Sequence, residues 1–373
     1  MRCSRAMSLR AMGWMLLFIG LSHEASSPAL AKALDPVSKK ERLHYIRSAQ
    51  VWQPTDVSHR DIWRGPEDML SFNFEQRVDC DYIPKKAEGT TAKFLCKTSD
   101  GTKIKVRYEA PNGKVYSMPA GTRLFWALGF GAVRSYPVKV HCRGCPEDPW
   151  MNPESDDVAD RWFHPAVADL KMPGKAIVET DHEDSGWSWD ELDLIDERHG
   201  GAPRKHRDAL KLLAALVQHG DNNAGQQKLI CLPDGIQEDS SGRSFCTRPF
   251  MMVEDLGSTF GGAEMLDERA SMNLAAWEHH SIWKDPTRCV ADLAHTPFGT
   301  LSDPKISEKG RAFLAELLSQ LTDRQIEDIF RVGRADRRDQ NEQGRFRKLV
   351  PISEWVRVFK VKRAEILNAR CRN

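Results

Sequence analysis

The stretch His219-Gly-Asp-Asn-Asn-Ala-Gly-Gln-Gln-Lys-Leu-Ile-Cys231 is the part of the sequence that decides the fold. An apolar segment, residues 208–218, runs directly into it, with leucine and alanine recurring at helical spacing. A second apolar run, Phe250–Val253, follows further along the chain and leads to Asp255. The pattern predicts one acid, Asp221, in a polar loop after a buried helix, and another at the end of a buried strand. This layout suits the binding of a metal ion and a phosphorylated ligand.

The chain as a whole has the composition of a globular protein. It contains 373 residues, of which 40% are hydrophobic and 29% are charged. This length is sufficient for one large domain or two ordinary domains with a sizeable core. The formal net charge is +1 and the basic residues are spread along the chain. We therefore expect no nucleic-acid partner and no polybasic attachment to membranes.

The N-terminus has the pattern of an export signal. A positively charged start is formed by Arg2, Arg5 and Arg10. An apolar run at residues 11–21 follows, and Ala29-Leu-Ala31 offers a cleavage site. The run is shorter than the roughly 20 residues that a spanning helix needs. We predict a signal peptide at residues 1–31 and a periplasmic or secreted protein with no membrane span in the mature chain. An uncleaved anchor is the alternative.

Cysteine usage agrees with export. Cleavage would remove Cys3 and leave an even number of cysteines, which in an oxidising compartment predicts disulfides. Pairing by proximity, with the last pair found by elimination, gives Cys80–Cys96, Cys142–Cys145, Cys231–Cys246 and Cys289–Cys371. A rival interpretation of His141-Cys-Arg-Gly-Cys145 is half of a zinc site, although a second Cys-x-x-Cys is missing.

The order of predicted elements indicates two lobes. Residues 32–71 contain few apolar clusters, and we expect an exposed N-terminal extension there. Residues 72–150 predict a β-rich lobe, with one helix at about Met118–Leu128 and alternating strands at Arg77–Ile83, Ala92–Cys96, Lys103–Tyr108 and Tyr136–His141.

The rest of the chain, residues 151–373, predicts a mainly helical lobe. Residues 143–185 have a loop-like composition. Helical periodicity and end signals then predict helices at Pro203–Gln218, Ser307–Leu321, Thr322–Val332 and Ser353–Ala369. The expected fold class is therefore α+β, with a small β-rich N-lobe before an α-rich C-lobe.

A glycine-led turn in the first lobe is a candidate phosphate site. It consists of Gly89, Thr90, Thr91, Ala92 and Lys93, between two predicted strands. Such a turn presents backbone N–H groups, to which the threonine hydroxyls and the lysine add phosphate donors. An ordinary β-turn accounts for the same residues. Lys105 lies on an alternating strand nearby, where it would contact nucleotide phosphates or face solvent.

The opening stretch supplies the candidate catalytic and metal-binding groups. Asp221 is placed to accept a proton from a substrate hydroxyl or to position that hydroxyl. The neutral oxygens of Asn222, Asn223, Gln226 and Gln227 suit a hard metal such as Mg²⁺, and Asp255 adds a charged oxygen. Ordinary turn residues after a helix would give the same local pattern at Asp221.

Taken in order, these features resemble the protein-kinase-like fold, in the branch of the HipA-type kinases and the phosphatidylinositol 3-/4-kinases. The resemblance spans about Asp79 to Gly262. The turn from Gly89 to Phe94 is similar to the G-x-Q-P-K phosphate loop of the HipA group.

The same resemblance implies roles for four further residues. Lys105 stands where that family keeps its ATP-phosphate lysine. Asp221 and Gln226 resemble the Asp-x-x-x-x-Asn loop, which implies a catalytic carboxylate and a metal ligand. Val253-Glu-Asp255-Leu-Gly257 resembles D-F-G, which implies that Asp255 binds Mg²⁺ or Mn²⁺.

The resemblance thus implies an atypical kinase that transfers phosphate from ATP to a hydroxyl of a protein or small molecule. Three departures from the family pattern fit either an atypical kinase or a pseudokinase. Gln226 replaces the usual asparagine, and Asn222 and Asn223 stand inside the loop where histidine or arginine is often found. No glutamate lies in Val115–Leu128 to pair with Lys105, while Lys114 stands just ahead. The alternatives are a catalytically silent pseudokinase that binds a nucleotide or a partner, and a structural envelope protein.

Overall fold

The computed structural model describes residues 34–66, 70–180, 186–261, 271–297, 299–338 and 349–371. The predicted signal peptide, residues 1–31, lies outside the described residues. No helix within these ranges combines the length and the apolar character that crossing a membrane would require.

The N-terminal lobe is a closed barrel of five strands in the order β1-β2-β3-β5-β4. All neighbouring pairs are antiparallel except β1 with β4. The strands are β1 (Gln76–Ile83), β2 (Lys93–Thr98), β3 (Lys103–Tyr108), β4 (Arg134–Pro146) and β5 (Val158–Leu170). Their alternating apolar side chains fill the barrel with a core of its own, which includes Phe94, Val106 and Tyr136.

The strand β5 corrects two sequence predictions. Residues 143–185 are not loop-rich throughout, because β5 runs through them and pairs with both β3 and β4. The β-rich lobe therefore extends to Leu170 and does not end at residue 150. Charged and polar residues at the start of β5 hid its strand pattern, since this end lies toward solvent.

The second lobe is mainly helical. Its helices are α3 (Arg204–Leu216), α4 (Leu274–His279), α5 (Glu308–Ser319), α6 (Asp323–Val332) and α7 (Ile352–Asn368). Thr322 and Gln325 form the predicted capping box at the start of α6. A small three-stranded sheet has the order β10 (Pro249–Val253), β7 (Gln227–Cys231) and β6 (Lys175–Ala176). Two short strand pairs complete the described part of the lobe: β8 (Ile236–Glu238) with β9 (Ser244–Cys246), and β11 (Trp283–Asp285) with β12 (Val290–Ala291).

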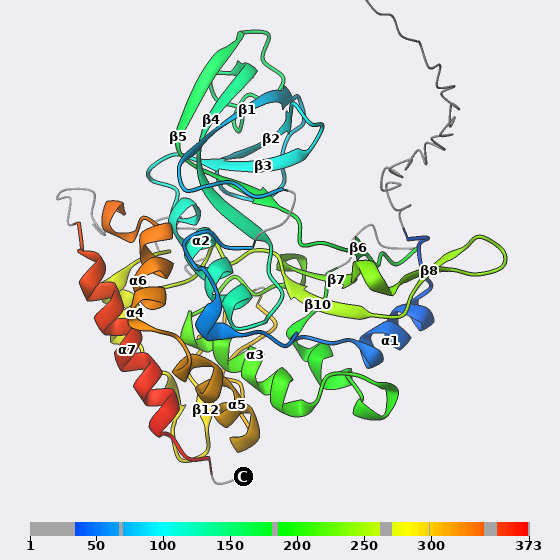
Figure 1. Ribbon diagram of the computed structural model, residues 1–373, viewed down its shortest axis with the longest axis vertical. Helices are drawn as coiled ribbons and strands as arrows, with labels where there is room; N and C mark the ends of the chain where they lie inside the picture. The colour runs from blue at the N-terminus through cyan, green and yellow to red at the C-terminus, as the bar shows by residue number, and fades with distance from the viewer. Residues whose placement is uncertain are drawn as a thin grey trace, which may run out of the picture. The chain divides into compact units, whose positions relative to one another are not determined.

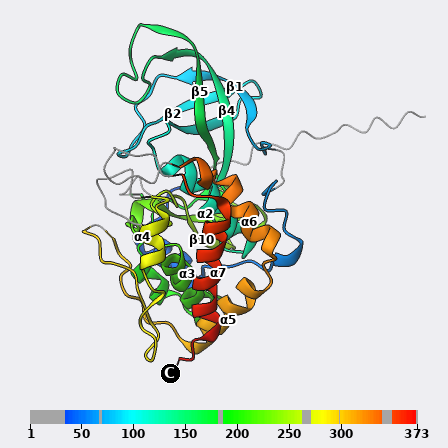
Figure 2. The ribbon, with the colours of Figure 1, turned by 90° about the vertical axis from the view of Figure 1, so that its left-hand side faces the viewer.

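Helix α2 (Lys114–Ala127) joins the two lobes. It begins four residues before the predicted start, and its side chains are buried in the same core as α3 and α6. Both views show the barrel strands on one side of α2 and the helices α3, α6 and α7 on the other (Figures 1 and 2). The predicted α+β, two-lobed organisation is confirmed.

The N-terminal extension is not exposed as expected. Helix α1 (Lys39–Ser48) opens with a capping box at Ser38, and Ile46, Val51 and Ile62 are buried in the main core. These apolar residues are spaced irregularly along the chain, so they give no periodic signal in the sequence. The extension is therefore part of the folded body.

All four predicted cysteine pairs are confirmed. The structure joins Cys80–Cys96, Cys142–Cys145, Cys231–Cys246 and Cys289–Cys371. Cys142 and Cys145 are thus not half of a zinc site. Four disulfides are consistent with an extracellular protein.

Candidate functional site

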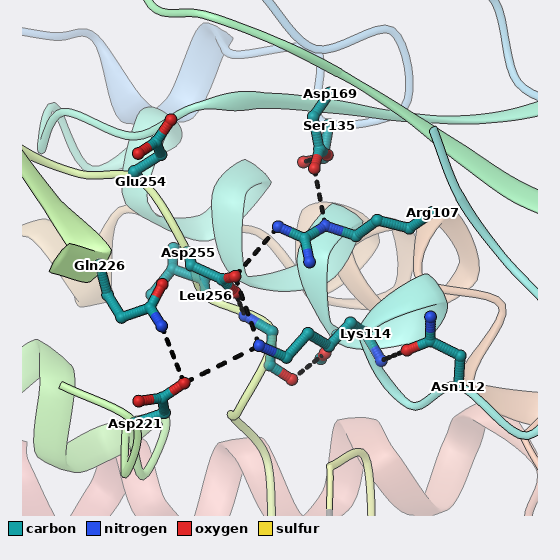
Figure 3. Close-up of polar contacts among 12 residues, drawn as sticks. Arg107, Asn112, Lys114, Ser135, Asp169, Asp221, Gln226, Glu254, Asp255 and Leu256 are labelled. Carbon is teal, nitrogen blue, oxygen red and sulfur yellow. Dashed lines mark hydrogen bonds and ion pairs between the residues drawn. The ribbon is translucent and has the colours of Figure 1, made fainter. Parts of the chain in front are cut away.

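A cluster of charged side chains lies where the barrel meets the helical lobe (Figure 3). Its members come from four elements that are far apart in the sequence: β3, the start of α2, the loop after α3 and the end of β10. Three of the predicted residues, Asp221, Gln226 and Asp255, are among them.

Asp255 is held in place by the small sheet. The preceding strand β10 is buried throughout, and it pairs with β7 so that Val253 lies opposite Gln227. The backbone N–H groups of Glu254 and Asp255 donate to the carbonyl of Gln226, at 2.8 and 3.1 Å. The main chain of Gln226 thereby fixes the position from which the Asp255 side chain reaches the charged cluster.

Every oxygen of the Asp255 carboxylate accepts from the protein. Gly257 N donates to Oδ1 at 2.7 Å, while Arg107 Nη2 and Lys114 Nζ reach Oδ2 at 3.0 and 3.3 Å. Burial alone would raise the pKa of Asp255, but the positive charges of Arg107, Lys114 and Lys105 hold it well below its usual value of 3.8. Asp255 is therefore ionised.

Asp221 lies in the loop after α3, as predicted. Asn223 Nδ2 donates to its Oδ1 at 2.6 Å, and Gln226 Nε2 donates to its Oδ2 at 3.0 Å. Lys114 Nζ lies 3.8 Å from the same Oδ2. The side chain of Asp221 is 23% exposed, against 11% for Asp255. Asp221 is thus the more accessible of the two acids.

The loop that carries Asp221 is clamped by Asn222. The fully buried Asn222 side chain donates to the carbonyls of His219 and Leu301, at 2.9 and 3.1 Å, and accepts from Leu301 N at 2.9 Å. Sequence analysis took Asn222 for a metal ligand, and this interpretation was wrong. Its amide is engaged on both sides in holding the loop.

Arg107 was missed by sequence analysis. It lies on β3 two residues after Lys105, so both side chains are on one face of the strand. Arg107 Nε donates to Asp169 Oδ2 at 2.7 Å, and Ser135 Oγ donates to Asp169 Oδ1 at 2.6 Å. Two signals in the sequence could have indicated this pair. Arg107 continues the two-residue spacing of Lys103 and Lys105, and Asp169 is an acid within the apolar end of β5.

Lys114 was also missed as a site residue. It is the first residue of α2, and its backbone N–H donates to Asn112 Oδ1 at 3.1 Å. Its stem passes over Gly257, where an added Cβ would lie 2.5 Å from Lys114 Cδ. Because no side chain stands at Gly257, the ammonium of Lys114 reaches both Asp221 and Asp255 (Figure 3).

The glycine-led turn lies beside this cluster. Lys93 starts β2 directly opposite Arg107 on β3, so the two side chains share a face. Gly89 has a φ of +104°, which side chains rarely adopt, and an added Cβ would lie 2.4 Å from Lys93 Nζ. Thr91 is buried, whereas Thr90 is exposed. Burial and the charge of Arg107 lower the pKa of Lys93 to about 7.

Lys105 is half-buried on the same face of β3 as Arg107. Its charge acts on Asp255 and Lys93, but the two cations that contact Asp255 directly are Arg107 and Lys114. A phosphate-binding role for Lys105 stays a prediction.

A hollow of about 260 Å³ is lined in part by Glu254, the residue before Asp255. It lies along the segment that links β5 to β6, and its other walls come from β7 and β10, the strands next to Gln226 and Asp255. Its walls include the apolar side chains of Met172, Ile230 and Met252 and the charged side chains of Lys171, Lys228 and Glu254.

Comparison with solved structures finds a likeness to a bacterial kinase. The crystal structure of the Helicobacter pylori proinflammatory kinase CtkA aligns with a TM-score of 0.42 and 9% sequence identity, over 78% of this chain and 96% of that chain. No protein-family model and no curated protein matches this chain. The interpretation of the cleft therefore depends on the geometry of its own residues.

Proposed function

We propose that this chain binds ATP between its two lobes and transfers the terminal phosphoryl group to a hydroxyl of a protein or small molecule. One observation carries the proposal: Asp221 and Asp255, from separate elements, converge on Lys114 beside Lys93 and Arg107. Phosphoryl transfer requires mainly positioning and neutralisation of charge, and this cluster offers both. The hollow beside Glu254 would hold the base.

In the proposed reaction, Asp221 holds the acceptor hydroxyl. The new P–O bond forms as the bond between the terminal phosphorus and the bridging oxygen breaks. The hydroxyl proton passes to Asp221, and the nucleoside diphosphate leaves with the bridging-oxygen electrons. Lys93, Arg107 and Lys114 would stabilise the charge on the phosphates. The position of Asp221 in the more accessible part of the cleft supports this assignment.

The test compares the parent protein with Asp221→Asn. We expect ATP binding to stay within about threefold while transfer falls by about 10²–10⁴, the usual contribution of a general base. ATP binding is measured by equilibrium dialysis, and transfer by ADP release with panels of hydroxyl-bearing peptides and lipids. Asp303→Asn is the control, because Asp303 is similarly part-buried and pairs with Lys284 elsewhere in the helical lobe.

The second candidate is a module that binds the nucleotide without transferring phosphate. It is favoured by the engagement of both Asp255 oxygens with protein donors. Binding of ATP by the parent protein without ADP release on any panel would support this module and contradict the transferase. No binding at all would contradict both and leave the structural envelope protein. The HipA-type branch stays a prediction.

A further inference from the structure

The donor set around Asp255 is poorly suited to the Mg²⁺ or Mn²⁺ that the family resemblance implies. Mg²⁺ binds carboxylate oxygens at about 2.0–2.1 Å in near-octahedral geometry. Asp255 Oδ2 already accepts from Arg107 at 3.0 Å and from Lys114 at 3.3 Å. A divalent ion on this oxygen would lie beside two positive charges. Gln226, the other predicted ligand, donates its amide nitrogen to Asp221.

The ammonium group of Lys114 lies between the carboxylates of Asp221 and Asp255. Its Nζ is 3.3 Å from Asp255 Oδ2 and 3.8 Å from Asp221 Oδ2 (Figure 3). The lysine is 7% exposed, and its stem is confined by Gly257. Within the part of the chain that the structure describes, no three His, Cys, Asp or Glu side chains are grouped to hold a metal ion.

Arg107 is also held in place, and one nitrogen of its guanidinium has no hydrogen-bond acceptor. It is 1% exposed, and Asp169 orients its guanidinium toward Asp255. Its Nη1 is buried without a hydrogen-bond acceptor, and the buried hydroxyl of Thr91 also has no partner. A buried donor without an acceptor costs free energy, and an anion entering the cleft would remove that cost. These unpartnered donors therefore favour the binding of a negatively charged ligand.

We propose that Arg107 and Lys114, together with Lys93, neutralise the nucleotide phosphates in place of a divalent metal ion. The inference rests on the proposed function and defines its cofactor: the site takes the metal-free nucleotide. Arg107 offers its unpartnered Nη1 to a phosphate oxygen, and Lys114 offers a point charge between the acids.

The first experiment measures ATP binding to the full chain in excess EDTA and in Mg²⁺. We expect the two dissociation constants to agree within about threefold, because the protein supplies the positive charge itself. Binding that weakens by about tenfold or more in EDTA would overturn the inference but leave the proposed function standing. Absence of binding in both conditions would overturn the inference together with the proposed function.

The second experiment uses Lys114→Ala, which opens the space between the two acids. In EDTA we expect ATP binding to weaken by about tenfold, as for loss of one charge-assisted contact. We also expect the variant to acquire binding of Mn²⁺, detected by its electron paramagnetic resonance signal, which the parent lacks at this site. The control is Lys211→Ala, since Lys211 is similarly buried and pairs with one acid, Asp193, on another face.

Three outcomes of this second experiment would overturn the inference. The first is that the parent and Lys114→Ala bind Mn²⁺ with equal affinity, and that adding Asp255→Asn to either protein abolishes this binding. The second is Lys114→Ala binding ATP in EDTA as tightly as the parent. The third is loss of ATP binding in Lys211→Ala to the same extent, which would trace the effect to stability. Lys114→Arg, which keeps the charge, should retain metal-free binding.

Discussion

At the scale of single residues, the cleft is determined by which charges are buried together. Arg107 lies between Asp169 and Asp255. The side chains of Arg107 and Asp169 are both almost fully buried. Such a buried network is costly to disrupt, because removing one member leaves uncompensated charge. Lys93 adds one more cation opposite Arg107. Burial, together with the positive charge of Arg107, explains why the pKa of Lys93 is low.

The lowered pKa of Lys93 predicts a pH dependence of nucleotide binding. With a pKa of about 7, Lys93 loses its proton as the pH rises from 7 to 9, so ATP affinity should fall over this range. In the same range the unfolded chain keeps the proton, so the contribution of Lys93 to the free energy of unfolding rises with pH. Equilibrium dialysis and urea unfolding at each pH measure the two trends.

Lys93→Met is the comparison for this prediction. The variant should bind ATP more weakly at pH 7, and its affinity should change little up to pH 9. A parent protein whose ATP affinity is constant from pH 7 to 9 would contradict the assignment of Lys93 to the phosphate site.

At the scale of elements, the loop between α3 and β7 positions Asp221. The helix ends at Leu216, and Gln218 then takes a φ of +52°, which turns the chain out of the helix. The next residues are held from both sides: Asn222 joins the loop to Leu301, and the carbonyl of Gln226 joins it to β10. The loop is thus a rigid connection between two buried elements, as a catalytic group requires.

Asn222→Ala tests this role of the loop. The variant would leave the carbonyls of His219 and Leu301 without their donor, so we expect a loss of about 2–4 kcal/mol in the free energy of unfolding. Transfer activity should fall with it, because Asp221 would no longer be held. Urea unfolding measures the first effect and ADP release the second. The exposed Asn152→Ala is the control, and unchanged unfolding of Asn222→Ala would contradict the clamp.

At the scale of the whole molecule, residues 33–373 form one compact unit with two hydrophobic cores. One core fills the barrel, and the other extends through α2, the small sheet, the C-terminal helices and the N-terminal extension. The disulfides stabilise this body to different degrees. Cys289–Cys371 spans 82 residues and ties the C-terminus beyond α7 to the segment before α5, whereas Cys142–Cys145 spans 3.

The difference in span predicts a difference in stability. Because a cross-link restricts the unfolded chain more when its loop is longer, Cys289→Ser with Cys371→Ser should cost about 4 kcal/mol in the free energy of unfolding. Cys142→Ser with Cys145→Ser, the matched control, should cost about 1.5 kcal/mol. Urea unfolding under non-reducing conditions measures both. Equal losses, or a larger loss for the short loop, would contradict this ranking.

The sequence by itself determined the elements whose signals are local. Alternation predicted β3, the capping residues predicted α6, and proximity predicted three of the disulfides, because each depends on neighbours along the chain. The fourth disulfide, Cys289–Cys371, followed by elimination. The same local patterns placed Asp221 after a helix and Asp255 after a strand.

Only the tertiary structure decided which charges meet in the cleft. Arg107 and Lys114 are separated from Asp255 by 148 and 141 residues, so no spacing in the sequence reports these contacts. The burial of the N-terminal extension and the membership of β5 in the barrel were hidden for the same reason. Local patterns specify elements, whereas the packing of distant elements selects Lys114 as the cation that lies between Asp221 and Asp255.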